Sequence, residues 1–404
     1  MLIEIILASL VGIAFGTFTG LAPGIHINLI SAILLGSLTS IPFLDTLPKI
    51  SLAVFIVSMA VTHSFLDFIP SIFLGAPDED SFLSILPGHQ LLKQGKGYEA
   101  VVLTLYGSLS SLPIVLVFIP IFIFFLPAIN RIIYPIIPFI LIFASLYLVF
   151  REKEFLIPLS VFFLAGFLGL ITFNLPIKEP LLPLLTGLFG SSALLVSFKD
   201  PVNKLPKQET PPLKQITLPK KQILKSSLAA SLSAPLCSFL PGIGSGHAAV
   251  ISSEIFEHDS RSFLFLVGAI NLIVTSLNFV ALYVINKTRS GAAVAVKSLL
   301  NTVTAQNLAI IIAAIIFSAL ISFFLGIKIA RLSSKHIYKV NYKVLSIITL
   351  AVLLLVNIIF SNLLGILVLF SATSLGIFTI LSNSRRINLM GALLIPTIIF
   401  YLTL

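Results

Sequence analysis

Long apolar stretches separated by short polar breaks run along the whole chain. The first half holds a closely spaced pair and five single stretches, at 2–22 and 26–43, then 50–74, 98–127, 131–150, 155–174 and 180–197. The second half repeats this order, at 222–240 and 246–256, then 262–285, 305–330, 343–360, 362–382 and 387–404. Apolar runs of about 18 residues or more are typical of transmembrane helices rather than of a soluble core. The pattern therefore predicts an all-α polytopic membrane protein.

Each closely spaced pair is interrupted by Pro and Gly. The breaks read "GLAPGIHIN" at 20–28 and "FLPGIGSGHAA" at 239–249. If each broken pair enters and leaves the membrane on one side, the five single spans that follow it invert the second half. The sequence therefore predicts two inverted-topology repeats, each a Pro-Gly interrupted helix pair plus about five transmembrane helices. The repeats cover 1–197 and 222–404, and 198–221 links them.

The distribution of basic residues supports this inversion. The linker is rich in Pro and Lys, which predicts a solvated, cytoplasmic segment. With the linker inside, 19 of the 25 Lys and Arg residues also fall inside, as the positive-inside rule expects. Both termini are then expected outside the cell membrane. Local matches agree with a repeat, because "VTHSFLDFIPSIFLGA" (61–76) aligns with "VTSLNFVALYVINKTRSGA" (274–292) and pairs Asp67 with Asn278.

Composition and charge narrow the class of protein. Apolar residues make up 57% of the 404 residues and charged residues 10%, with a mean hydropathy of +1.12. Soluble domains carry about a quarter charged residues, so an ordinary globular enzyme is excluded. The net charge of +10 is explained by basic residues that orient the chain in the membrane and contact anionic lipid headgroups. No nucleic acid partner is expected. The single Cys237 excludes an intramolecular disulfide.

The two breaks are the candidate substrate site. A helix that begins after a Pro-Gly break presents free N–H groups and the positive end of its dipole, which attract anions. Glycine also lets a ligand approach the backbone closely. The substrate-binding candidates are Pro23, Gly24, His26, Asn28, Pro241, Gly242, Gly244, Ser245, Gly246 and His247. The structural alternatives are kinks at helix contacts, helix caps and packed neutral imidazoles.

A second set of residues is expected to couple transport to an ion. Asp67 lies within an apolar run, four residues after His63 and on the same helix face. A carboxylate at that depth is functional by default, although a structural His63–Asp67 pair is the alternative. The ion-coupling candidates are Thr62, His63, Asp67, Thr275 and Asn278. No metal site or cofactor is predicted beyond a coupling Na⁺ or H⁺. The acidic run Asp78, Glu79 and Asp80 is either a solvated loop or a gating loop.

Together these motifs resemble the large permease subunit of the tripartite tricarboxylate transporters, the TctA family. A third motif, "PGHQLLKQGKGYEA" at 87–100, is the most specific match. The resemblance implies an ion-driven carboxylate carrier, with a small membrane subunit and an extracytoplasmic binding protein as partners. Two departures stand out: Ile25-His26 replaces the second glycine of the first motif, and residues 78–80 are acidic where the family has small residues.

The leading functional hypothesis is a secondary active transporter of a small organic anion, a di- or tricarboxylate, driven by Na⁺ or H⁺. A carrier of a phosphate-bearing lipid is the alternative, because the same helix termini bind phosphate. An intramembrane hydrolase built on Ser245 and His247 is disfavoured, since residues two apart on a helix point to different faces and no G-x-S-x-G elbow is present. The sequence leaves the substrate, the coupling ion and a homodimer open.

Overall fold

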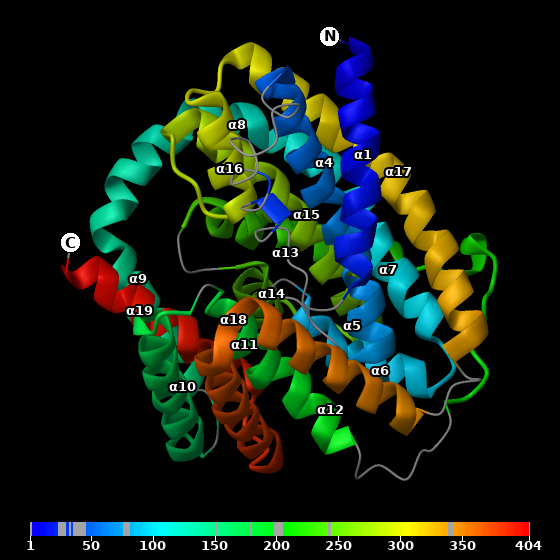
Figure 1. Cartoon of the computed structure of the whole chain (residues 1–404), viewed down its shortest axis with the longest axis vertical. Helices are drawn as coiled ribbons and strands as arrows, with labels where there is room; N and C mark the ends of the chain where they lie inside the picture. The colour runs from blue at the N-terminus through cyan, green and yellow to red at the C-terminus, as the bar shows by residue number, and fades with distance from the viewer. Residues whose placement is uncertain are drawn as a thin grey trace.

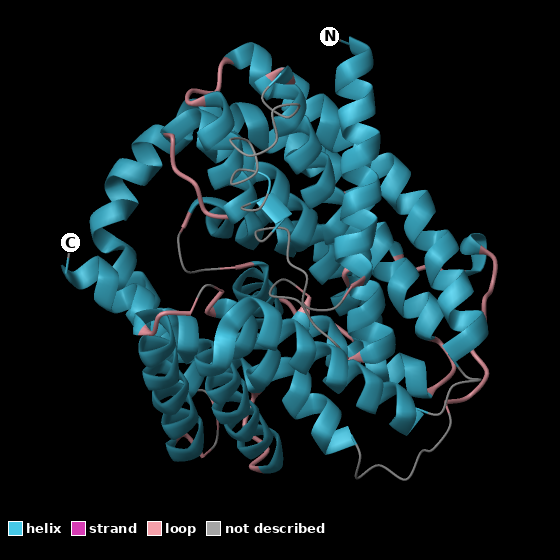
Figure 2. Ribbon diagram, in the orientation of Figure 1, coloured by secondary structure: helices cyan, strands magenta, loops and turns pink. Residues whose placement is uncertain are grey.

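The structure is a computed structural model that describes residues 2–22, 30–31, 34, 46–75, 81–150, 152, 154–177, 179–197, 205–240, 244–337 and 342–403. Every regular element among these residues is a helix (Figures 1 and 2). The first half contains α1 (Leu2–Leu21), α4 (Lys49–Leu66), α5 (Phe68–Leu74), η1 (Phe82–Ser84), α6 (Ile85–Lys93), α7 (Gly97–Ser110), α8 (Leu112–Ile133), η2 (Tyr134–Ile136), α9 (Ile137–Phe150), α10 (Leu156–Asn174), α11 (Leu181–Leu185), η3 (Thr186–Ser191) and α12 (Ser192–Ser197). The second half contains η4 (Leu213–Gln215), α13 (Lys220–Phe239), α14 (Ser245–Ile255), α15 (Ser260–Ile285), α16 (Gly291–Leu300), α17 (Ala305–Ile337), α18 (Tyr342–Leu381), η5 (Arg386–Met390) and α19 (Gly391–Thr403).

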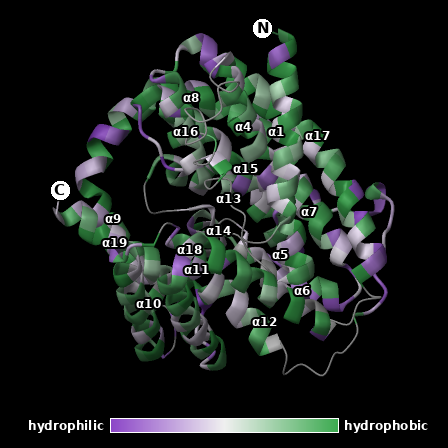
Figure 3. Ribbon diagram, viewed as in Figure 1, coloured by the Kyte–Doolittle hydropathy of each residue, from purple (hydrophilic) through white to green (hydrophobic). Residues whose placement is uncertain are grey.

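Eight helical segments of the described chain are long and apolar enough to cross a membrane. They are Leu2–Leu21, Lys49–Leu74, Gly97–Tyr147, Leu156–Asn174, Ser260–Ile285, Ala305–Ile337, Ser346–Leu381 and Arg386–Thr403. In Figure 3 much of the helical ribbon has the colour of hydrophobic residues. The expected all-α polytopic membrane protein is therefore confirmed, whereas the inverted repeat stays a prediction.

Proline and asparagine set helix boundaries inside two of the long apolar segments. The apolar stretch at 98–127 contains two helices, because α7 and α8 meet at Ser111, just before Pro113. Pro135 lies in the 3₁₀ turn η2 that separates α8 from α9. Proline lacks a backbone donor and disfavours helical conformation in the residue before it. Asn362 interrupts α18 with a φ of 58°, at the boundary expected between 343–360 and 362–382.

Two spans form the centre of the molecule, α4 with α5 and α15. In the apolar 18-residue stretch of each span, 94% and 89% of the residues are buried. α1 packs on α4 through Gly12, Gly16 and Gly20, and a Cβ added to Gly12 or Gly16 would lie 2.5 Å from a backbone oxygen of α4. α13 packs on α15 and has buried small residues at the same four-residue spacing, at 230, 234 and 238. Small residues at this spacing let membrane helices approach closely.

The two halves interleave around this centre. α7 of the first half packs on α15, and α17 of the second half packs on α4. The α7–α15 crossing is the tighter one: a Cβ on Gly107 would lie 1.9 Å from the Phe265 oxygen, and a Cβ on Gly268 would lie 2.1 Å from the Thr104 oxygen. Ser108 Oγ donates to the Gly268 oxygen at 3.0 Å across this crossing. Helices of both halves therefore build one core bundle, which consists of α1, α4–α8 and α13–α17.

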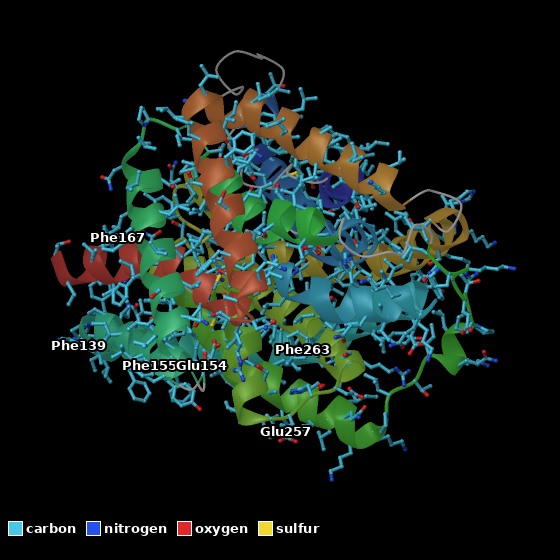
Figure 4. The ribbon with its side chains drawn as sticks, turned by 90° about the horizontal axis from the view of Figure 1, so that it is seen from below. Phe139, Glu154, Phe155, Phe167, Glu257 and Phe263 are labelled. Atoms are coloured by element: carbon cyan, nitrogen blue, oxygen red, sulfur yellow. The ribbon has the colours of Figure 1, made fainter. Side chains whose placement is uncertain are left out.

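The remaining helices form a second group, the outer bundle, made of α9–α12, α18 and α19. Within it α10 packs on α19, and α18 packs on the π-helical turn η3 and its flanks. In Figure 1, α9, α10 and α19 lie at the lower left, whereas α12 and the first half of α18 extend across the lower part of the view toward the right. Phe139, Phe155 and Phe167 are exposed and project from its surface (Figure 4). Exposed aromatic side chains on apolar helices are expected where a protein faces lipid rather than water.

The described part of the linker is largely exposed, as its composition predicted, but four of its residues are buried. Leu205, Ile216 and Leu218 are buried, and Gln208 is 6% exposed. The Gln208 side chain accepts from the Gly97 N–H at 2.8 Å and donates to the Leu92 oxygen at 3.1 Å. Scattered apolar residues thus fasten 205–219 across the α6–α7 corner. The average composition of the segment, which is rich in Pro and Lys, gave no sign of these few buried residues.

Candidate functional site

The helix that follows the second break, α14, lies where the two bundles meet. It packs on α13 and α15 of the core bundle, and the Ser252 hydroxyl lies 2.7 Å from the Ser233 hydroxyl of α13. Another face of α14 lines a cavity whose other walls come from α9, η5 and α19 of the outer bundle. Gly244 is extended, and the helix begins at Ser245. The first N–H groups of α14, which have no intrahelical acceptor, therefore lie at the bundle boundary.

His247 caps its own helix. Its Nδ1 accepts from the Gly244 N–H at 3.0 Å, so one of the alternatives considered for this residue, a packed and hydrogen-bonded imidazole, holds for one ring nitrogen. The other nitrogen, Nε2, is buried and has no hydrogen-bond partner among the described residues. Ser245 and Gly246 are buried beside it. The predicted candidates Pro241 and Gly242 lie outside the described residues.

A cation accompanies this helix terminus. The Arg289 guanidinium, in the loop after α15, is close enough to act electrostatically on the His247 imidazole and on the Cys237 thiol. Arg289 was not among the predicted site residues, because it lies more than 40 residues after the second break in the sequence. A fixed positive charge and a helix N-terminus on one side of the second break both favour an anion.

The first break cannot be compared with the second. The candidates Pro23, Gly24, His26 and Asn28 lie outside the described residues, as do Asp78, Glu79 and Asp80. The residue before the acidic loop is described: Gly75 has a φ of 67°, and a Cβ there would lie 2.9 Å from His89 Cε1 and 3.3 Å from a Leu194 methyl. α6 of the core bundle and α12 of the outer bundle thus meet where this loop begins.

The ion-coupling candidates of the first half lie close together in the chain, on α4 and at its junction with α5. His63 Nδ1 lies 3.1 Å from Thr19 Oγ1 of α1, and Thr62 accepts a hydrogen bond from Ser322 of α17 at 2.9 Å. Asp67 is 3% exposed at the junction of α4 and α5. The structure therefore places Thr62, His63 and Asp67 on one buried segment between α1 and α17.

The candidates of the second half lie on α15 and have different partners. Asn278 Nδ2 donates to Ser290 Oγ at 2.6 Å, and Ser290 in turn caps α16. Thr275 is half-buried one turn earlier. The hydrogen bond that Asn278 donates therefore connects it to the N-cap of α16, and its role in ion coupling stays a prediction.

Sequence reasoning missed Asn271, which links the two central helices. Its side chain is fully buried, and Nδ2 donates to the Ser64 oxygen at 3.2 Å, one turn before Asp67. Asn271 Oδ1 has no hydrogen-bond partner among the described residues. An available signal was that Asn271 precedes Asn278 by seven residues, which is two helical turns on one face. The carboxamide adds a neutral oxygen close to the predicted carboxylate.

The fold and this site define a polytopic membrane protein with a broken helix at the boundary of a core bundle and an outer bundle, and with a cation that acts electrostatically on that helix terminus. The family model of the tripartite tricarboxylate transporter TctA family matches residues 6–391, and the chain belongs to this family. It is 35% identical to an uncharacterized protein of Methanocaldococcus jannaschii, over 97% of this chain and 98% of that protein. No solved structure matches the chain. The resemblance carried by the three motifs is thereby confirmed, and the chain belongs to a family of transporters.

Proposed function

We propose that the protein is a secondary active transporter of a small organic anion, a di- or tricarboxylate, driven by Na⁺ or H⁺. Membership of a tricarboxylate transporter family supports a permease. The observation that carries the proposal is the position of α14, which begins at the bundle boundary within the electrostatic influence of Arg289. Ligand sites at such boundaries are common, because relative motion of the two parts opens and closes them.

The proposed binding mode follows from the groups at the start of α14. Carboxylate oxygens accept from its first N–H groups, and the Arg289 charge adds a long-range attraction that is stronger away from bulk water. The outer bundle then moves against the core bundle, and the site opens to each side in turn. The 3₁₀ turn η2, which contains Pro135 and connects the bundles, is the proposed hinge among the described connections.

Ion coupling is proposed for the buried polar group around Asp67. A carboxylate and neutral oxygens are the ligands that hard cations prefer, and a carboxylate also takes up H⁺. Asn271 Oδ1, which belongs to the carboxamide bound at Ser64, adds a candidate ligand to Thr62 and Asp67. The acidic loop at 78–80 is proposed as a gate, and the partner subunits named by the tripartite family stay proposals for this chain.

Ligand-induced stabilisation tests the anion site. The purified protein is heated with citrate, succinate or phosphate, with and without Na⁺. A ligand at 100 times its dissociation constant stabilises by about 2.7 kcal/mol in the simple one-site case. We expect a carboxylate response that needs at least about tenfold more ligand in Arg289→Gln, the affinity change given by about 1.4 kcal/mol. Arg131→Gln, which removes an exposed charge on α8, is the control. Equal responses in both variants would contradict the role of Arg289.

One variant separates the carrier from a hydrolase. Because His247 Nδ1 is occupied by the Gly244 N–H, that nitrogen is not poised to take a proton from Ser245. Ser245→Ala should therefore change substrate affinity in a carrier. Complete loss of a hydrolytic turnover in this variant would instead support the enzyme.

A further inference from the structure

An elongated apolar cavity adjoins the start of α14. Its volume is about 290 Å³, and one wall is formed by His247, Val250, Ile251 and Ile255. These residues fall on one face of α14 and extend along about 12 Å of the helix axis, at 1.5 Å per residue. Ala144 of α9 and Leu394 of α19 lie among the residues of the opposite walls. The cavity therefore runs from the second break along the boundary between the bundles.

The two ends of this cavity differ in chemistry. His247 lines it, and the contact from the Gly244 N–H to Nδ1 assigns the proton of a neutral ring to Nε2. His247 is 6% exposed, and Nε2 has no partner among the described residues. The helix N-terminus lies at the same end, and the Arg289 guanidinium acts electrostatically on His247 there. None of the described residues that line the cavity carries a formal charge apart from a protonated imidazole, and the remainder of the wall is apolar except for Tyr147.

We propose that the cavity binds the hydrocarbon chain of a single-chain amphipathic anion, whose carboxylate lies at His247 and the start of α14. This inference rests on the anion site of the proposed function and goes beyond its di- or tricarboxylate substrates, because the ligand is a carboxylate that carries a hydrocarbon chain. Charge complementarity supports the occupant, since donors and a cation gather at one end only. The volume lies at the lower limit of small-molecule pockets, which suits one short chain better than a two-chain lipid. Exposed Phe143 and Tyr147 line the cavity, so the chain enters from the membrane side.

A chain-length series tests the proposal. Hexanoate, octanoate and decanoate are titrated against the protein in lipid nanodiscs, and octanol serves as the uncharged probe. Each buried methylene contributes about 0.8 kcal/mol, which tightens binding about fourfold. Ala144→Phe should fill the cavity and flatten this dependence on chain length. Leu146→Phe is the matched control, because Leu146 lies on the same helix, is 43% exposed and does not line the cavity. Partition into the bilayer is common to all three proteins and cancels in the comparison.

Each outcome decides a different part of the proposal. A fourfold gain per methylene in the wild type and in Leu146→Phe, lost in Ala144→Phe, supports it. The same slope in all three proteins overturns the cavity as the chain site, and octanol binding as tightly as octanoate overturns the anionic head group. A phospholipid that copurifies with the wild type but not with Ala144→Phe overturns the choice of occupant. Citrate or succinate binding that depends on Arg289 would leave the proposed function standing in any of these cases, and its absence would count against that function separately.

Discussion

Replacing Asn271 by leucine should separate stability from ion coupling. The carboxamide is fully buried between the central helices, donates one hydrogen bond to the Ser64 oxygen and has an Oδ1 without a partner among the described residues. Such a group is costly in an apolar core, so its presence there indicates a function. We expect Asn271→Leu to change the stability of the protein only modestly, because opposing contributions nearly offset one another, while transport loses its dependence on the coupling ion.

The magnitude follows from three contributions. Losing the hydrogen bond to Ser64 costs about 0.5–1.5 kcal/mol, whereas removing a buried polar atom that lacks a partner relieves about 1–3 kcal/mol. The apolar side chain adds about 1 kcal/mol of favourable burial. The Ser64 oxygen lies in the last turn of α4, and the helix is interrupted at Asp67 before α5 begins at Phe68. Loss of the Asn271 donor therefore raises the first cost to about 1–3 kcal/mol, the cost of a buried acceptor without a partner. The net expectation lies between about 1 kcal/mol less stable and about 3 kcal/mol more stable.

The assay combines reversible denaturation with uptake into proteoliposomes at varied Na⁺ concentration and pH. Asn357→Leu is the matched control. Asn357 is equally buried, donates to its own helix at the Leu353 oxygen over 2.8 Å and also has an Oδ1 without a described partner, but it lies on α18 of the outer bundle. Its replacement should have a similar effect on stability and none on the ion profile. A loss of more than about 2 kcal/mol in Asn271→Leu, or an unchanged ion profile, would refute the reasoning.

Three further changes test other parts of the account. Asp67→Asn should alter the Na⁺ or pH dependence of uptake more than the substrate preference, and identical profiles would count against coupling at this residue. Gly107→Ala should lower the free energy of unfolding by about 1–3 kcal/mol, because the new methyl group meets the Phe265 oxygen at 1.9 Å. This overpacking outweighs the gain in helix propensity of about 1 kcal/mol. Equal or higher stability would mean that α7 and α15 separate freely. Asp259→Ala should cost about 1 kcal/mol at neutral pH through the lost cap of α15. Burial alone would raise the pKa of Asp259, but hydrogen bonds from the Ser262 hydroxyl and N–H lower it overall. This stabilisation is therefore present above the ordinary carboxyl pKa and is lost as the pH falls through the lowered one, so the variant should show a weaker acid dependence in a denaturation series.

Apolar periodicity predicted most of the helices, because length and hydropathy alone determine which segments can span a bilayer. Apolar periodicity did not predict the helix boundaries that single residues determine. Ser111 and Pro113 divide one apolar run into α7 and α8, and a run of apolar letters carries little information about that division. The packing of 205–219 was missed for a similar reason, since Leu205, Ile216 and Leu218 contribute little to the average polarity of a segment rich in Pro and Lys.

The candidate site was predictable only where it is local in sequence. The Gly-Ser-Gly-His run identified the start of α14, and its glycine and histidine form the cap that the structure describes. Arg289 and the walls on α9 and α19 come from distant segments, and only the tertiary fold brings them to the break. Asn271 had a local signal, its spacing to Asn278, but an amide with no charge is easily taken for a packing residue.

The most direct test of the account is uptake of a labelled carboxylate into proteoliposomes that contain only the purified protein. The account predicts accumulation above equilibrium when an inward Na⁺ or H⁺ gradient is imposed, its collapse when that gradient is dissipated, and a clear loss of apparent affinity in Arg289→Gln. Uptake no greater than in protein-free liposomes for every carboxylate and either gradient would contradict a stand-alone ion-driven carrier. Accumulation that is unaffected in Arg289→Gln would contradict the placement of the anion at α14.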